Sequence, residues 1–325
     1  MRNNKKWLVI VIVSALGIVA VVWTNWGRIA VQLAPRKKAA TSRSEAATKA
    51  DELFWQTFHN AEYEKIQPAL EVLTAAYLQT PADAKTAAHI GWLHIWRLSE
   101  RARLNSIPAT STDDAVMARK YFTEAVTLDP SDARYLGFLA ASILAEGGIH
   151  RDEKLTREGY FMLRDSIRAW PEFNLFTAGY VMSQQPADSP RFREGLEWEW
   201  RNLDVCAQEK IDRANPEYSK YMSSETKEGQ KRVCWNSWIA PHNFEGFFLN
   251  MGDMLVKSGN WQTAQNIYAN AKHSREYGSW KFQAVLEDRI KQAQSNAALF
   301  NAPEETAKAR IMINSEFSCM ACHQQ

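Results

Sequence analysis

Between about Ser44 and Ala297 the apolar residues recur with the period of an amphipathic helix, and no run shows the alternation of a convincing strand. The periodic segments are about 12–18 residues long and end at Pro or Gly. This pattern predicts an all-α fold built from antiparallel helix pairs. A second kind of pattern, an unbroken apolar run at residues 7–23, predicts one further helix near the N-terminus.

The clearest repeat unit begins at Phe248 and ends at Ala271, with the pattern F-x2-M-G-x2-L-x3-G-x4-A-x3-Y-x2-A. Small residues, Gly252 and Ala264, stand where the two helices of a pair would cross closely, and Gly259 stands at the turn between them. The pattern resembles the tetratricopeptide repeat (TPR). That resemblance implies a degenerate array of helical hairpins whose concave face binds a protein partner, such as a peptide or a helix.

Partial copies of the second half of this unit occur at three other places, and each ends at a proline. Two of them are followed by new helix starts at Asp83 and Asp132. The copies are Ala69, Leu73, Ala76, Pro81; Ala118, Phe122, Ala125, Pro130; and, more weakly, Gly159, Leu163, Ser166, Pro171. The alternative is a generic helical bundle with chance matches. The TPR resemblance covers roughly residues 60–180 and 245–295, and residues 100–114 and 185–242 do not fit it.

The segment at about 185–242, which does not fit the TPR pattern, is interpreted as an aromatic-rich insert. Its aromatic side chains either cap the concave groove of the array or belong to the core. The aromatic residues in and just after it are Trp198, Trp200, Trp235, Trp238, Phe244 and Phe247.

The apolar run at 7–23 has a length near the lower limit of a transmembrane helix and carries no charge. Trp7, Trp23 and Trp26 bracket it as interfacial aromatics do, and Arg2, Lys5 and Lys6 precede it. Bulky residues at 21–23 argue against signal-peptide cleavage, so residues 1–26 are predicted to be an uncleaved signal anchor, with a cleaved signal as the alternative. Residues 27–44 then form a basic spacer, which serves solubility or contacts anionic lipid head groups.

Composition and charge narrow the possible partners. Of the 325 residues, 46% are hydrophobic and 23% charged, which is typical of a globular protein. Residues 1–44 contain eight of the 39 Lys/Arg and no acidic residue, so the remainder carries 31 Lys/Arg against 37 Asp/Glu. A mildly acidic body lacks the basic surface that nucleic-acid binding requires, so no nucleic-acid partner is expected.

The candidate chemistry lies at the C-terminus, where Cys319, Cys322 and His323 form C-x-x-C-H. Two thiols three residues apart can form thioethers with the two vinyl groups of one haem, and the adjacent imidazole then lies under the iron. The motif resembles the attachment site of c-type cytochromes. The resemblance implies one covalent haem c on Cys319 and Cys322, with His323 as the proximal iron ligand. It also implies a non-cytoplasmic location, because the attachment machinery lies there.

A thiol redox pair, half of a zinc or copper site and a chance match remain alternatives, although no βαβ pattern and no second Cys/His cluster accompanies the motif.

Only two residues follow His323, so the haem would be enclosed by residues that precede the motif or by a partner chain. We expect residues 298–325 to form a tail, with Asn301–Phe317 as a tether that is either a short helix at Pro303–Met312 or a flexible arm. The sequence does not assign the distal ligand, and an open iron is also compatible with it. The candidates are His59, His89, His94, His150, His242, His273, Met312 and Met320.

The other two cysteines, Cys206 and Cys234, are predicted to form one disulfide in an oxidising compartment, with two buried thiols as the alternative.

Together these features predict a single-pass protein of the inner (cytoplasmic) membrane with its bulk in the periplasm. Its TPR-like domain spans residues 45–297, and its haem transfers electrons to a partner docked on the repeats. An assembly scaffold or chaperone without redox turnover is the main alternative. A haem enzyme or gas sensor with an open axial site is a third.

Overall fold

The structure is a computed structural model that describes residues 2–222, 226–234, 244–303 and 311–323, with only the backbone given for 2–6, 8–16, 18, 20 and 314. In this part of the chain every regular element is a helix, which confirms the predicted all-α class. The chain divides into two units, residues 1–38 and 39–325, which are described separately.

The first unit contains helix α1 (Arg2–Leu33). This helix continues past Trp26 and includes the first residues of the predicted basic spacer. Among the side chains that are described, no helix is long and apolar enough to cross a membrane. Most side chains of the predicted span at 7–23 lie outside the described set, so the signal anchor stays a prediction.

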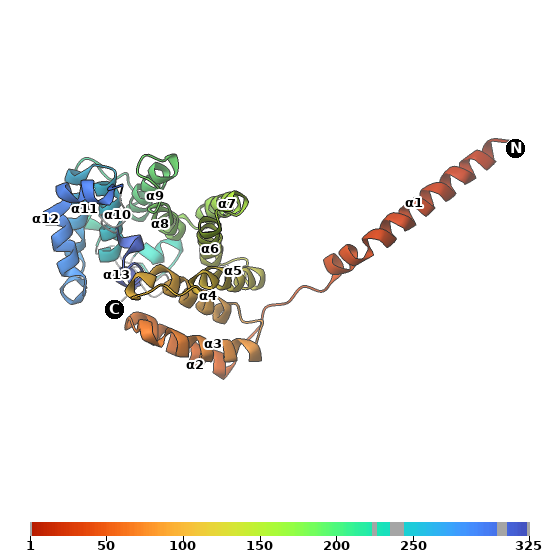
Figure 1. Ribbon diagram of the computed structural model, residues 1–325, viewed down its shortest axis with the longest axis horizontal. Helices are drawn as coiled ribbons and strands as arrows, with labels where there is room; N and C mark the ends of the chain where they lie inside the picture. Colours follow the sequence, from red (N-terminus) through yellow and green to blue (C-terminus); the bar gives the residue numbers. More distant parts are fainter. Residues whose placement is uncertain (1, 223–225, 235–243, 304–310, 324–325) are drawn as a thin grey trace. The chain divides into compact units, whose positions relative to one another are not determined.

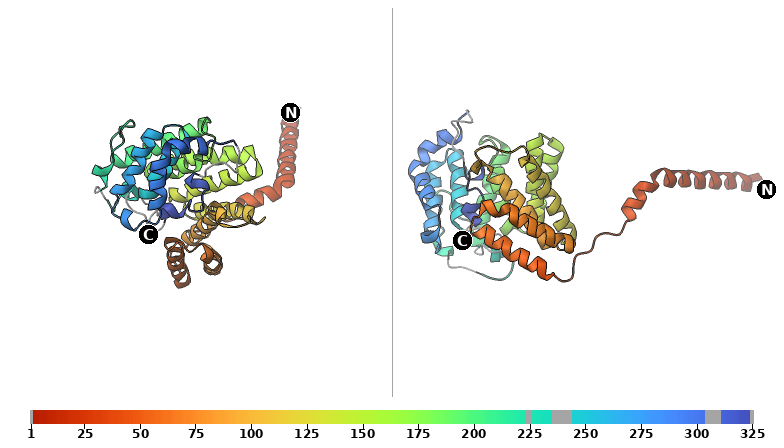
Figure 2. Two further views of the ribbon diagram at one scale, coloured as in Figure 1. Left: turned by 60° about the vertical axis from the view of Figure 1, so that its left-hand side comes forward. Right: turned by 60° about the horizontal axis from the view of Figure 1, so that its bottom comes forward.

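The second unit is an array of helical hairpins in which consecutive helices pack against each other (Figures 1 and 2). Short 3₁₀ segments connect some of them, at Tyr63–Lys65, Arg101–Arg103, Ala271–His273 and Tyr277–Ser279. The hairpins are α2 (Glu45–His59) with α3 (Ile66–Gln79), α4 (Ala84–Ser99) with α5 (Ser111–Leu128), α6 (Ala133–His150) with α7 (Glu153–Ala169), α8 (Pro171–Met182) with α9 (Pro190–Ala207), and α10 (Phe244–Lys257) with α11 (Trp261–Asn270), followed by α12 (Gln283–Phe300).

Side-chain caps begin these helices where the sequence predicted new starts. The carboxylate of Asp83 accepts hydrogen bonds from the N–H groups at the start of α4, and Asp132 does the same for α6. Pro171 occupies the first turn of α8, where its missing N–H costs nothing. The predicted turn residue Gly259 has a φ of +88°, a conformation that only glycine adopts without strain.

The hairpin of α10 and α11 packs as its small residues predicted. Gly252 lies against the ring of Tyr268, and an added Cβ would come within 2.7 Å of the ring carbon Cζ. Ala264 is fully buried at the same crossing. The hydroxyl of Tyr268 donates a hydrogen bond of 2.7 Å to Asp253, which ties the two helices together.

The predicted insert at 185–242 is corrected at its start. Its first part is α9, a regular second helix that packs against α8. The aromatic-rich sequence of α9 differs from the repeat pattern, so the sequence did not predict that this helix is the second helix of a hairpin. Trp198, Trp200 and Phe247 are buried in the core and Phe244 is half-buried, while Trp235 and Trp238 lie outside the described residues. The rest of the insert contains 3₁₀ turns at Ser219–Tyr221 and Gln230–Cys234.

The predicted tail at 298–325 is also corrected. Helix α12 continues to Phe300, and the described segment 311–323 is packed into the domain rather than extended from it. This segment contains a 3₁₀ turn at Met312–Asn314 and helix α13 (Met320–His323), which contacts α10 and α2 (Figure 1). The predicted helix at Pro303–Met312 falls largely on residues 304–310, outside the described residues. The apolar side chains of Ile311, Met312 and Ile313 account for the docking, because all three are buried.

Candidate functional site

The C-x-x-C-H motif lies inside the hairpin domain. Cys319 is 8% exposed and Cys322 is 3% exposed, and both are free thiols. His323 is half-buried. Five parts of the chain that are distant in sequence contact this turn, and none of their contact residues was identified from the sequence. They are α2, the residue after α4, α8, α10 and the residues just before α12.

Glu100, just beyond the end of α4, holds the start of the motif. One of its carboxylate oxygens accepts hydrogen bonds of 2.9 Å from the backbone N–H groups of both Cys319 and Met320. The other oxygen accepts a bond of 2.7 Å from Nε of Arg103. Glu100 is fully buried, and burial raises the pKa of its carboxyl although these donors favour the ionised form.

Two further side chains hold the backbone carbonyls of the turn. The hydroxyl of Tyr180 in α8 donates a hydrogen bond of 2.7 Å to the carbonyl of Ser318. The indole Nε1 of Trp280 donates one of 2.9 Å to the carbonyl of Ala321. Because Tyr180 lies in α8 and Trp280 in the connection before α12, the turn is held by two separate parts of the chain, in position as well as in conformation.

Gly246 in α10 provides the space that Cys322 occupies. An added Cβ at Gly246 would lie 2.7 Å from the carbonyl oxygen of Ala321 and closer still to Sγ of Cys322. Backbone atoms cannot move out of the way as a flexible side chain can, so this position requires glycine for the turn to dock as it does.

The imidazole of His323 packs against α2. Its ring centroid lies 4.8 Å from that of Phe58, which in turn stacks on Phe54 at 5.3 Å and meets Trp96 edge-on at 5.2 Å. Phe58, Phe54 and Trp96 are buried, so this aromatic wall is rigid and restricts where the imidazole can point.

Both thiols and the imidazole border a single cavity of about 420 Å³. Its other walls come mainly from α4, α5, α6 and α8 and are largely apolar, with Ile95, Leu98, Phe138 and Phe176 among them. This volume lies in the range of small-molecule and cofactor sites, about 300–1,000 Å³. The wall residues outside the motif all precede it in the sequence.

The electrostatics of the two cysteines disfavour a thiol redox pair. Burial raises the pKa of both thiols, and the nearby Glu100 carboxyl adds to the effect at Cys319. A nucleophilic thiol of the thioredoxin type needs the opposite, a lowered pKa and partial exposure. At neutral pH Cys319 and Cys322 are therefore protonated thiols that face an apolar cavity.

The described candidates for a distal ligand do not border the cavity. The wall residues do not include His59, His89, His94, His150, His273, Met312 or Met320. His242 lies outside the described residues. Met182 of α8 does border the cavity, and its Cβ also packs against Gly195 of α9.

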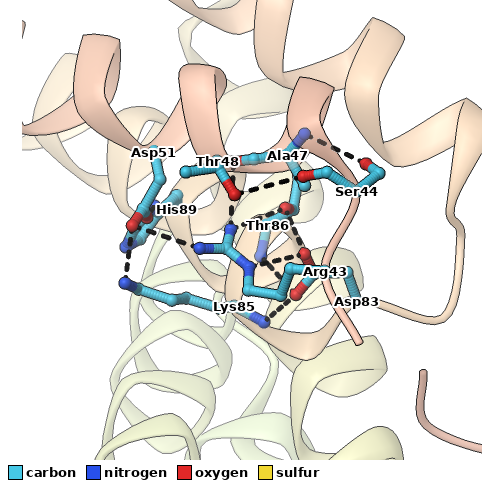
Figure 3. Close-up of polar contacts among 9 residues, drawn as sticks. All are labelled: Arg43, Ser44, Ala47, Thr48, Asp51, Asp83, Lys85, Thr86 and His89. Carbon is cyan, nitrogen blue, oxygen red and sulfur yellow. Dashed lines mark hydrogen bonds and ion pairs between the residues drawn. The ribbon is translucent and has the colours of Figure 1, made fainter. Parts of the chain in front are cut away.

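His89 belongs instead to a polar cluster that joins α2, α4 and the segment before α2 (Figure 3). Its Nδ1 lies 2.7 Å from a carboxylate oxygen of Asp51, whose second oxygen lies 2.6 Å from Nζ of Lys85. Nε of Arg43 lies 2.9 Å from Asp83, the N-cap of α4. Although burial raises the pKa of Asp51, His89 and Lys85 hold it below its ordinary value. The cluster clamps the first hairpins and does not border the cavity.

The remaining two cysteines, Cys206 and Cys234, are joined in a disulfide. It links the end of α9 to the 3₁₀ turn at Gln230–Cys234, and so fixes the described part of the insert to the hairpin array. The indole of Trp170 adds a hydrogen bond of 2.9 Å to the carbonyl of Gln230.

Among the described side chains, no group of three or more His, Cys, Asp or Glu residues is placed to hold a metal ion. Comparison of the chain with protein-family models, with curated proteins and with solved structures gave no match.

Proposed function

We propose that the protein is a membrane-anchored, periplasm-facing c-type haem protein that transfers electrons. In this proposal Cys319 and Cys322 form the thioethers and His323 is the proximal ligand. One observation carries it: the two thiols and the imidazole of the motif border the same largely apolar cavity of about 420 Å³.

The residues present fit such a group. Both thiols are buried beside the cavity, and the apolar walls would keep water away from a bound macrocycle. When bound, haem would supply a one-electron Fe(III)/Fe(II) couple whose potential depends on burial and ligation.

The chain's own residues would position the attachment site. Glu100, Tyr180 and Trp280 hold the backbone on both sides of the thiols, so Cys319 and Cys322 keep a fixed spacing and direction. Phe58 restricts the imidazole of His323. A site whose residues are already held in place changes its structure little when an electron is gained or lost. A small structural change favours fast electron transfer.

Other features support the proposed location and partner. The apolar run at 7–23 supports the anchor, and the Cys206–Cys234 disulfide fits an oxidising compartment such as the periplasm. The hairpin array, through its TPR resemblance, is proposed to dock the redox partner. Because the segment 311–323 already packs against α10 and α2, the partner would contact the array elsewhere.

The first experiment asks whether the motif carries covalent haem. The full chain would be expressed with an intact haem-maturation system and assayed by pyridine haemochrome spectrum and by haem stain on a denaturing gel. We expect a c-type signal near 37 kDa that is lost in Cys319→Ala and kept in the matched control Cys206→Ala plus Cys234→Ala. Absence of covalent haem from the wild type would refute the proposal.

A redox titration then separates electron transfer from the alternatives. A reversible one-electron couple supports the proposal. If the haem has no reversible couple while a protein partner binds equally well to Cys319→Ala plus Cys322→Ala, the protein is a scaffold. High-spin iron that binds CO would indicate an enzyme or sensor.

A further inference from the structure

We infer that Arg101 recognises a carboxylate in the cavity: its guanidinium binds a propionate of the haem that the proposed function attaches at Cys319 and Cys322. The inference rests on that proposed function and goes beyond it, because it assigns the polar end of the ligand to a residue outside the motif.

The described wall of the cavity carries one side chain of permanent charge. Among the described residues that border the cavity, Arg101 is the only one of the Asp, Glu, Lys and Arg type. Of the same described wall residues, His323 is the only other one with a titratable nitrogen. A cavity that is otherwise neutral and largely apolar, with one guanidinium, matches an amphiphilic ligand whose polar part is an anion.

The guanidinium of Arg101 keeps most of its hydrogen-bond donors available for a ligand. Its Nη1 donates a hydrogen bond of 2.7 Å to the carbonyl of Leu98, which uses one of the five N–H donors of a guanidinium. No carboxylate of the described residues pairs with it. The adjacent carboxylate, Glu100, is engaged by Arg103 and by the backbone of Cys319 and Met320.

The local fold explains this division of roles. Arg101 and Arg103 lie on one short 3₁₀ turn directly after α4. Arg103 neutralises the buried Glu100, whereas Arg101 borders the cavity and, among the described residues, donates its hydrogen bond to the carbonyl of Leu98 at the end of α4. Although the two arginines are only two positions apart, Arg103 supports the motif turn and Arg101 is placed to bind a ligand.

The chemistry favours a carboxylate over a neutral polar group. A guanidinium and a carboxylate form parallel, charge-assisted hydrogen bonds that are stronger than neutral ones, most of all beside apolar walls. A free apolar carboxylate, such as a fatty acid, shares this chemistry. The haem propionate is favoured because the thiols that would form the thioethers border the same cavity.

The test measures porphyrin binding without thioether chemistry. The full chain with Cys319→Ala plus Cys322→Ala would be titrated in one detergent with protoporphyrin IX and with its dimethyl ester, followed by porphyrin fluorescence. We expect the free acid to bind about tenfold more tightly than the ester. Arg101→Gln should remove this preference and Arg101→Lys should keep part of it. Arg168→Gln, which removes an exposed cation on α7, should keep all of it.

Equal binding of acid and ester by the chain with native Arg101, or an unchanged preference in Arg101→Gln, would overturn the inference. So would palmitate that competes as strongly as the porphyrin, because the site would then be a general carboxylate site. The two proposals fail separately. Covalent haem together with an unchanged preference in Arg101→Gln refutes only the role of Arg101, whereas the lack of covalent haem refutes the proposed function whatever the porphyrins do.

Discussion

Replacing Gly246 by alanine tests directly how the motif turn is docked. The added methyl group would lie 2.7 Å from the carbonyl oxygen of Ala321 and nearer to Sγ of Cys322, so the turn or α10 must shift. Overpacking of this kind costs about 1–3 kcal/mol. Alanine also recovers about 0.5–1 kcal/mol of helix propensity relative to glycine, which partly offsets that cost.

Gly148→Ala is the matched control. Gly148 also lies in a helix, α6, but an added Cβ there would meet nothing within 4 Å. It should therefore show the helix gain without the clash. The free energies of unfolding of the two variants should differ by about 1–3 kcal/mol, which corresponds to melting temperatures roughly 5 °C apart.

Two readouts follow in the haem-free protein. The first is thermal unfolding of the full chain in detergent by circular dichroism. The second is the rate at which Cys319 and Cys322 react with a disulfide reagent, since Cys206 and Cys234 are already bridged. We expect slow reaction in the wild type and in Gly148→Ala, and much faster reaction in Gly246→Ala. If Gly246→Ala matched the control in both melting temperature and thiol reactivity, the docking of the turn against α10 would be wrong.

Three further changes test other parts of the structure. Glu100→Ala leaves the buried N–H groups of Cys319 and Met320 without their acceptor, so denaturant unfolding should show a loss of about 2 kcal/mol or more, and a loss near zero would contradict the bonding described. Burial lowers the pKa of His59 from 6.5 to about 4, so between these pH values only the unfolded chain takes up the proton. Stability should therefore fall as the pH drops through this interval, and urea midpoints at pH 7.5 and 5 should lie closer together in His59→Gln. Reduction of the Cys206–Cys234 disulfide should cost about 3–4 kcal/mol for its sequence separation of 28, and an unchanged midpoint after reduction would contradict its role in fixing the insert.

The sequence predicted those parts of the fold that depend on local patterns. Helical periodicity, the caps Asp83 and Asp132 and the turn residue Gly259 each act within a few residues, so one segment contains the whole signal. Helix α9 was missed because its aromatic-rich sequence differs from the repeat pattern. The motif was visible for the same reason as the caps, since Cys319, Cys322 and His323 are nearly adjacent.

The surroundings of the motif could not be predicted in this way. Glu100 and Cys319 are 219 residues apart, and Tyr180 and Ser318 are 138 apart. Nothing in a local pattern links a glutamate that follows one helix with N–H groups in a distant turn. An acidic residue at the expected end of a helix, followed by two arginines within three residues, was the available signal in the sequence, but the same pattern is typical of an exposed helix end.

The docked segment 311–323 changes how the array should unfold. A linear stack of hairpins, in which each unit touches only its neighbours, can lose its terminal units one at a time. Here one short segment contacts α2 near one end of the array and α10 near the other, and it bonds to residues beyond α4 and in α8. If the hairpin at either end of the array unfolds, the segment 311–323 loses part of its contacts. Release of this segment would expose its own buried apolar side chains and those of the hairpins against which it packs. The array should therefore behave as one cooperative unit, closed by a segment that belongs to none of its hairpins.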